Sequence, residues 1–155
     1  MDKTKEQLTA EIRYAIRLCQ RTARLYRRVQ TLGVFFSILG GSAVFSTFTG
    51  GMPSWVAVTG GVLLAIAGAA LIAIRPADKA ALNEADIRRY QALMPTAESM
   101  TADQLNTAIN DAHRGDAPEI EPLRVVAYND MLEEINRMDC AINLSTVQRI
   151  LKAVA

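Results

Sequence analysis

The chain has 155 residues with a formal net charge of +1; half of the residues are hydrophobic and 21% are charged. This composition excludes an intrinsically disordered chain. The charges are unevenly placed, however, because residues 29–74 contain no Asp, Glu, Lys, Arg or His. The distribution therefore argues against a single compact soluble domain.

The two flanks of this charge-free stretch carry opposite charges. Residues 1–28 hold eight basic and three acidic side chains, a balance of +5. Residues 75–155 hold nine basic and thirteen acidic side chains, a balance of −4. The near-neutral total thus conceals a basic arm and an acidic tail.

The charge-free stretch contains two apolar segments, at about residues 31–48 and 55–74, near the ~20 residues that a helix needs to cross a bilayer. Residues 49–54 (Thr-Gly-Gly-Met-Pro-Ser) form a short turn between them. A secretory signal is rejected because a polar arm of some 28 residues comes before the first segment and a second segment follows. The alternative is a soluble buried hairpin, which the remaining polar residues could hardly cover. We therefore expect an antiparallel transmembrane hairpin over residues 29–75.

Basic residues near the ends of a span are retained on the cytoplasmic side. Arg24, Arg27 and Arg28 precede the first predicted span, and Arg75 and Lys79 follow the second, whereas the turn has no charge. Both termini are therefore predicted to be cytoplasmic.

Small side chains let helices pack closely in lipid. They recur every four positions on both predicted spans: Gly33, Ser37 and Gly41 on the first, and Gly61, Ala65, Ala69 and Ala73 on the second. These positions are predicted to close the hairpin or to pack copies of it side by side, so a homo-oligomer is expected.

Three hydroxyl residues, Ser42, Ser46 and Thr49, lie on another face of the first span. One interpretation is that they line a pore in an oligomer. The other is that each hydroxyl bonds to a carbonyl of its own helix, as Ser and Thr do readily.

The arm at residues 1–28 is predicted to be an amphipathic helix, which residues 4–7 (Thr-Lys-Glu-Gln) open with a capping box. Its apolar stripe includes Leu8, Ile12, Ala15, Cys19 and Tyr26. A second stripe is basic: Arg13, Arg17, Arg21, Arg24 and Arg28. Three explanations stay open for the basic stripe: contact with lipid headgroups, pairing with the acidic tail, or binding of a phosphate-bearing ligand.

Residues 76–155 are predicted to form a cytoplasmic helical domain, which makes the whole chain all-α. A helix over residues 77–94, ended by Pro95, has Ala81, Ala85, Tyr90 and Leu93 as candidate buried positions. A capping box at residues 101–104 opens a helix that should stop at Gly115. Pro122 starts another helix, and residues 145–148 cap a last one that ends near Val154.

No catalytic constellation is found in the sequence. His113 is the only histidine and is interpreted as a surface residue near a helix end, while Glu133 and Glu134 are interpreted as a solvated face. Cys19 and Cys140 do not form a disulfide framework. We therefore expect no enzyme, no cofactor, no metal site and no nucleic-acid partner.

The order of parts resembles the SLATT family of two-transmembrane effector domains from bacterial nucleotide-signalling conflict systems. The resemblance is carried by residues 14–17 (Tyr-Ala-Ile-Arg) before the spans and by residues 86–90 (Asp-Ile-Arg-Arg-Tyr) after them. It extends to residues 117–122 (Ala-Pro-Glu-Ile-Glu-Pro), followed by Ala127 and Tyr128.

This resemblance implies a membrane effector of an antiviral, abortive-infection type system in the bacterial inner membrane. Its oligomers would form a pore or depolarise the membrane on a signal from a cyclic nucleotide or a partner sensor protein. Arg13, Arg17 and Arg21 are the candidate contacts with a ligand or with headgroups. Two other classes stay open: a phage holin or superinfection-exclusion protein, and a passive membrane anchor or assembly subunit.

Overall fold

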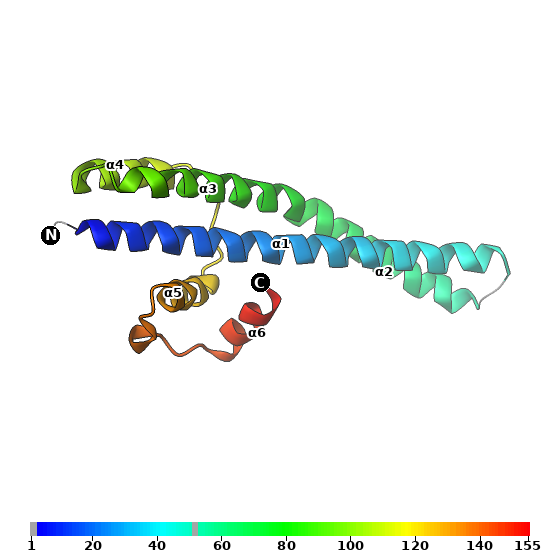
Figure 1. The fold of residues 1–155 in the computed structure, drawn as a ribbon. Helices are drawn as coiled ribbons and strands as arrows, with labels where there is room; N and C mark the ends of the chain where they lie inside the picture. Colours follow the sequence, from blue (N-terminus) through cyan, green and yellow to red (C-terminus); the bar gives the residue numbers. More distant parts are fainter. Residues whose placement is uncertain (1–2, 51–52) are drawn as a thin grey trace. The chain divides into compact units, whose positions relative to one another are not determined.

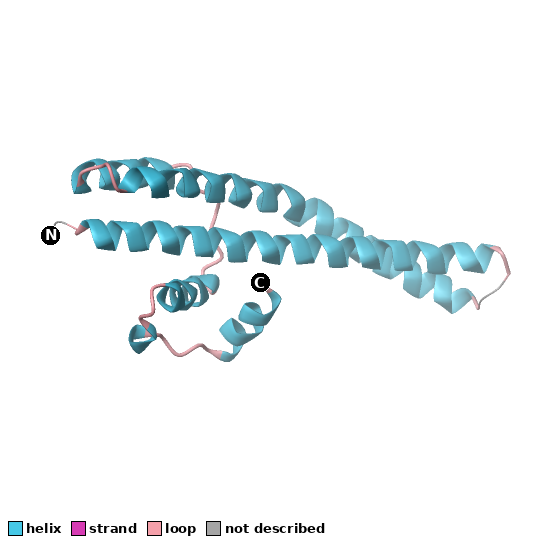
Figure 2. Cartoon of the chain, viewed as in Figure 1, coloured by secondary structure: helices cyan, strands magenta, loops and turns pink. Residues whose placement is uncertain are grey.

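The structure is a computed structural model that describes residues 3–50 and 53–155. Over these residues the chain is all-helical, as predicted, and contains no strand (Figures 1 and 2). Its elements are α1 (Lys5–Phe48), α2 (Ser54–Ile74), α3 (Pro76–Ala97), α4 (Ala102–His113), α5 (Leu123–Glu134), the 3-10 helix η1 (Met138–Cys140) and α6 (Thr146–Val154). The predicted turn includes Gly51 and Met52, which lie outside the described residues.

The chain divides into two compact units. The first unit comprises Met1–Leu25 and Lys79–Ala155, and the second comprises Tyr26–Asp78. Helix α1 contributes to both units as one helix of 44 residues. The amphipathic arm and the first apolar segment are therefore parts of a single helix.

The start of α1 confirms the capping box predicted there. The Gln7 amide donates to Thr4 Oγ1 at 3.3 Å, and the Thr4 amide donates to Gln7 Oε1 at 2.9 Å. These two bonds satisfy backbone donors that have no partner within the helix.

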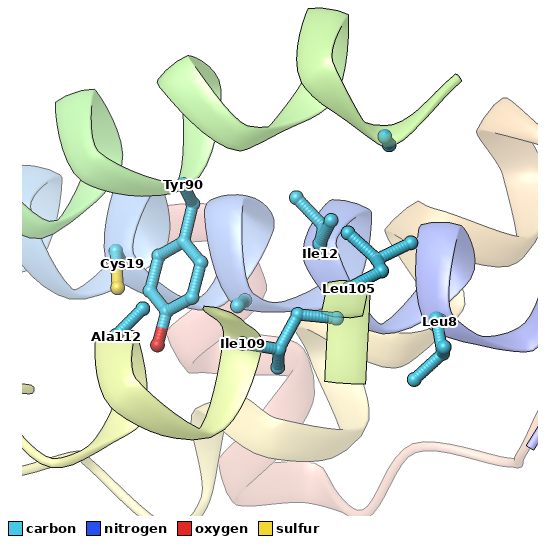
Figure 3. Close-up of a cluster of buried hydrophobic side chains, with 9 residues drawn as sticks. Leu8, Ile12, Cys19, Tyr90, Leu105, Ile109 and Ala112 are labelled. Carbon is cyan, nitrogen blue, oxygen red and sulfur yellow. The ribbon is translucent and has the colours of Figure 1, made fainter. Parts of the chain in front are cut away.

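The first unit has a core between α1, α3 and α4, which we call the α1–α3–α4 core (Figure 3). It buries Leu8 and Ile12 of α1, Tyr90 of α3, and Leu105 and Ile109 of α4. Ala15 and Cys19 are buried in the same cluster, so four predicted members of the apolar stripe lie in the core. Burying each large apolar side chain contributes about 1.5–3 kcal/mol before the opposing conformational entropy is counted.

A second cluster, the α1–α5–α6 core, uses another face of α1. It buries Leu18 of α1, Leu123 and Ala127 of α5, and Ala155. The segment between α5 and α6 is held by Asn129, whose Nδ2 donates to the Ile142 carbonyl at 2.7 Å and whose Oδ1 accepts from the Ile142 amide at 3.0 Å. Helix α1 is thus the central element of the first unit.

The predicted buried face of α3 is wrong at two positions. Ala81 and Ala85 are exposed, while Asn83, Asp86 and Tyr90 are buried. The polar residues can be buried because they have partners: Asn83 Nδ2, for example, donates to the carbonyl of Lys79 at 2.8 Å. A pattern of apolar residues could not reveal this face, because polar side chains occupy it.

One predicted helix end differs from the structure. Pro95 lies inside α3, which continues to Ala97. A proline removes one N–H donor, and near the end of a helix the following residues can still complete the turn. The predicted end of α4 is confirmed, because the helix stops at His113 and Gly115 follows its C-cap, Arg114. The backbone of Gly115 is not left-handed, however, and a Cβ there would lie 2.8 Å from Arg89 Nη1. The absence of a side chain at Gly115 therefore leaves room for the guanidinium of Arg89.

Candidate functional site

The second unit exposes most of its apolar side chains. Phe45, Phe48 and Ile72 are among its most exposed large hydrophobic residues. The helical stretches Lys5–Phe48 and Ser54–Ala97 contain 18-residue windows with mean hydropathies of 1.6 and 2.3, and only 6% of each window is buried. Two helices are therefore long and apolar enough to cross a membrane, and their exposure is unlike that of helices in a soluble core.

Helices α1 and α2 approach each other closely at a pair of glycines. A Cβ on Gly40 would lie 2.5 Å from the Gly60 carbonyl oxygen, and a Cβ on Gly60 would lie 2.7 Å from the Gly40 carbonyl oxygen. Gly33, which comes earlier in α1 than Gly40, faces Leu71, which comes later in α2 than Gly60. The two helices of this unit therefore pack antiparallel.

The small residues singled out from the sequence lie in different surroundings. Gly33 meets Leu71, and a methyl group on Gly61 would lie 3.9 Å from Val44 Cγ2, whereas Gly41 faces open space. Ala65 and Ala69 are exposed. Ser37 is half-buried, and its hydroxyl donates to the Gly33 carbonyl at 2.9 Å.

The three hydroxyls proposed for a pore face bond within α1 and its last turn. Ser42 donates to the Ile38 carbonyl at 2.8 Å, and Ser46 donates to the Ala43 carbonyl at 3.0 Å. Thr49 donates to the Ser46 carbonyl at 2.9 Å. Each hydroxyl thus donates to a carbonyl three or four residues earlier in the chain. This is the second of the two interpretations of these residues, in which they bond to their own helix.

In the first unit, the arginine stripe of α1 meets acidic residues of α5. Arg13 Nη1 lies 2.6 Å from Glu134 Oε1, and Arg17 Nη2 lies 2.9 Å from Glu134 Oε2. One carboxylate thus bridges two arginines that are one helical turn apart. Glu134, which the sequence placed on a solvated face, is the acceptor of both.

Arg21 makes a more buried ion pair than Arg13 or Arg17 does. Its Nε and Nη2 donate to Asp130 Oδ2 and Oδ1 at 2.7 and 3.0 Å, and the two side chains are only 14% and 13% exposed. The remaining Nη1 donates to the carbonyl of Lys152 at 3.0 Å. Because this two-pronged geometry is favourable for Arg and carboxylate, Arg21 joins α1, α5 and α6.

These contacts are those of an arginine stripe paired with the acidic tail. Burial would raise the pKa of Glu134, but hydrogen bonds and charges from Arg17 and Arg13 outweigh it and hold the pKa below its usual value. The carboxylate is therefore ionised at neutral pH. A groove of about 360 Å³ runs over the stripe, with Arg24 and Glu133 also in its lining.

Sequence reasoning missed a polar cluster that joins α3 to the end of α4. The Tyr90 hydroxyl donates to Asp116 Oδ2 and lies 2.8 Å from His113 Nδ1, which is itself 2.9 Å from Asp116 Oδ2. Burial, and then the bond to Asp116, raise the pKa of Tyr90 above its usual value. His113 is therefore part of a bonded cluster. The only signal in the sequence was its place three residues before an aspartate.

A second aspartate completes this cluster. Asp86 is 2% exposed, pairs with Arg89 Nη2 at 3.0 Å and accepts from the Ala117 amide at 2.9 Å. Arg89 also donates to the Ala112 carbonyl at 2.7 Å and lies 3.6 Å from Asp116 Oδ1. The arrangement ties the chain after α4 to α3, which is a structural role.

The cysteines provide a test of this packing. Burial, followed by the nearby carboxylates, raises the pKa of Cys19 to about 12, whereas Cys140 is exposed. Because the thiolate is the reactive form, we expect a maleimide reagent to label Cys140 at neutral pH and Cys19 at least about 100-fold more slowly. Mass spectrometry of the folded and unfolded protein measures both rates. Fast labelling of Cys19 in a folded Cys140→Ser variant would contradict the packing of α1.

An open cleft of about 730 Å³ lies between the start of α1 and the ends of α3 and α5. Lys5 and Arg13 line it together with Glu98 and Glu134, and Lys5 Nζ donates to the Glu98 carbonyl at 2.6 Å. Its charges are mixed in sign, so it does not favour one class of ligand. Within residues 3–50 and 53–155, no group of three or more His, Cys, Asp or Glu side chains is placed to hold a metal ion.

Comparisons with protein-family models, with curated proteins and with solved structures find no match to this chain. In the described part of the chain, the geometry singles out two candidate functional features: the exposed apolar pair of helices, and the arginine stripe with its acidic partners.

Proposed function

We propose that the chain is an inner-membrane effector of a bacterial antiviral system, which oligomerises to form a pore or to depolarise the membrane when a signal arrives. In this proposal α1 and α2 span the bilayer as a hairpin, and both termini are cytoplasmic. The SLATT-like order of parts is one support. The main support is that α1 carries both the arginine stripe and an exposed apolar segment in one unbroken helix.

The arginine pairs act as a latch in this proposal. While Glu134 and Asp130 neutralise the stripe, α1 is held against α5 in the resting state. A phosphate-bearing ligand, such as a cyclic nucleotide, or an acidic partner would compete with these carboxylates for the arginines in the groove above them. A signal that binds the released arginines more tightly shifts the population toward the active arrangement.

The proposal is tested by inducible expression in bacteria with a membrane-potential dye. We expect the Glu134→Gln and Asp130→Asn double variant to depolarise cells at lower expression than the natural sequence, because each substitution weakens the latch. Glu121→Gln is a control on an exposed carboxylate for which no contact with the stripe is seen. Immunoblotting of membrane fractions verifies equal amounts of each variant.

The outcomes separate the competing functions. Depolarisation that depends on an added cyclic oligonucleotide or on a partner supports the signalled effector. Equal depolarisation by the natural chain, the latch variant and the control favours a holin. No depolarisation by any variant that reaches the membrane contradicts an effector and leaves a passive anchor.

A further inference from the structure

Helix α6 uses only part of its apolar surface within the first unit. Leu151 and Ala155 pack in the α1–α5–α6 core. Val147 and Ile150 are 60% and 59% exposed, and Val154 is exposed as well. Because these three residues follow at spacings of three and four, they form one apolar stripe on the outer side of α6.

The charges around this stripe differ from those of the preceding tail. Residues 140–155 contain Arg149 and Lys152 and no acidic side chain, whereas residues 75–139 contain seven basic and thirteen acidic side chains. By helical spacing, both basic residues lie away from the apolar stripe. An exposed apolar stripe with a basic opposite face is typical of helices that lie in the interface of an anionic membrane.

Helix α6 is fixed rather than loosely attached. Arg21 Nη1 donates to the Lys152 carbonyl, and Asn129 holds Ile142 in the segment before the helix. Leu25 of α1 packs in the same core as Leu151, and it stands four residues before the charge-free stretch begins at Val29. The core that carries α6 therefore includes the last part of α1 before its apolar segment.

We infer that α6 docks on the anionic lipid surface, with Val147, Ile150 and Val154 in the boundary between headgroups and acyl chains. Three exposed apolar residues form a patch far below the ~1,200 Å² of total surface that a stable protein interface buries. A lipid surface does not need such an area, because the apolar segments of the same chain keep α6 at high effective concentration. This docking goes beyond the proposed effector function and does not depend on whether the membrane is depolarised.

The test uses the full chain in vesicles, with a Cys140→Ser background and one polarity-sensitive dye per protein. The dye is placed in turn at Ile150→Cys, at Met138→Cys as an exposed apolar control in the same tail, and at Ile66→Cys on the exposed surface of α2. Vesicles are made of phosphatidylcholine alone or with one-third phosphatidylglycerol, and they contain a lipid with a nitroxide quencher near its headgroup. Dye fluorescence reports water exposure, and quenching reports lipid contact.

We expect the dye at position 150 to be shielded from water and quenched in the anionic vesicles, and the dye at position 138 to stay in water. Replacing Arg149 and Lys152 with Gln should reduce the ratio of docked to undocked α6 by about fivefold per charge. A dye at position 150 that remains in water overturns the inference. The inference is also overturned if the dye at position 150 is shielded from water but not quenched, and if this shielding increases with the protein-to-lipid ratio. A second copy of the chain would then cover α6.

Two controls keep this result distinct from that of the proposed function. Equal quenching at positions 138 and 150 overturns a specific role of α6, because the whole tail would then lie on lipid. A dye at position 66 that stays in water shows that α2 is not inserted, which contradicts the membrane part of both proposals. With position 66 in lipid and position 150 in water, only the docking of α6 fails.

Discussion

Replacing Gly40 with alanine is expected to destabilise the packing of α1 against α2 by about 1–3 kcal/mol. The new methyl group would lie 2.5 Å from the Gly60 carbonyl oxygen and 2.8 Å from the Leu64 amide nitrogen. Both are backbone atoms, so the helices must separate to make room. Unfolding of the full chain in mixed micelles, followed by helix content and by spin-label distances between α1 and α2, measures the effect.

Gly41 offers a matched control for this experiment. It is the next residue of the same helix, and a methyl group there would meet no atom within 4 Å. Gly41→Ala should therefore leave the interhelical distance unchanged and gain up to about 1 kcal/mol from helix propensity. Equal stability of the two variants would show that α1 and α2 do not meet at Gly40 and Gly60.

Replacing Arg21 with methionine is expected to destabilise the first unit by about 3 kcal/mol. In the natural protein, the guanidinium of Arg21 donates two hydrogen bonds to the carboxylate of Asp130, which is only 13% exposed. The substitution leaves this carboxylate without that partner. Removing one partner of a buried ion pair costs more than the pair itself contributes, because the remaining charge stays desolvated. Urea unfolding of the full chain in detergent, followed by circular dichroism, gives the free-energy difference.

Two further variants identify the cause of this loss. Arg114→Met removes an ion pair with Asp111 whose side chains are 81% and 60% exposed, and we expect a change within about 0.5 kcal/mol. The double variant Arg21→Met with Asp130→Leu should recover most of the stability, since it removes the stranded charge as well. No recovery would mean that Arg21 acts mainly through its bond to the Lys152 carbonyl.

The elements of the fold could be predicted because their signals are local. The capping boxes that open α1, α4 and α6 each depend on residues three positions apart, and all three are formed. The two apolar segments required only a count of uncharged residues. The apolar stripe of α1 followed from helical periodicity, and its members Leu8 and Ile12 are fully buried.

The contacts between helices could not be predicted in the same way. The spacing of small residues selected Gly41 and Gly61, but their neighbours Gly40 and Gly60 make the contact between the two backbones. Consecutive residues of a helix point about 100° apart, so the choice within each glycine pair depends on how the helices cross. Likewise, the sequence left three partners open for Arg21, because its bond with Asp130 joins residues 109 positions apart.

The bridge that Glu134 makes to Arg13 and Arg17 has a mechanical consequence. Arginines recur along α1 at spacings close to one helical turn, so sliding α1 by one turn past α5 would bring Arg17 and Arg21 to the positions that Arg13 and Arg17 now occupy. Glu134 would again face two guanidinium groups, but Asp130 would face the position of Leu25 in place of Arg21, so this slide would leave a carboxylate that is 13% exposed without its partner. The Arg21–Asp130 pair therefore fixes the register of α1 against α5 and opposes a slide of four residues, about 6 Å along the helix.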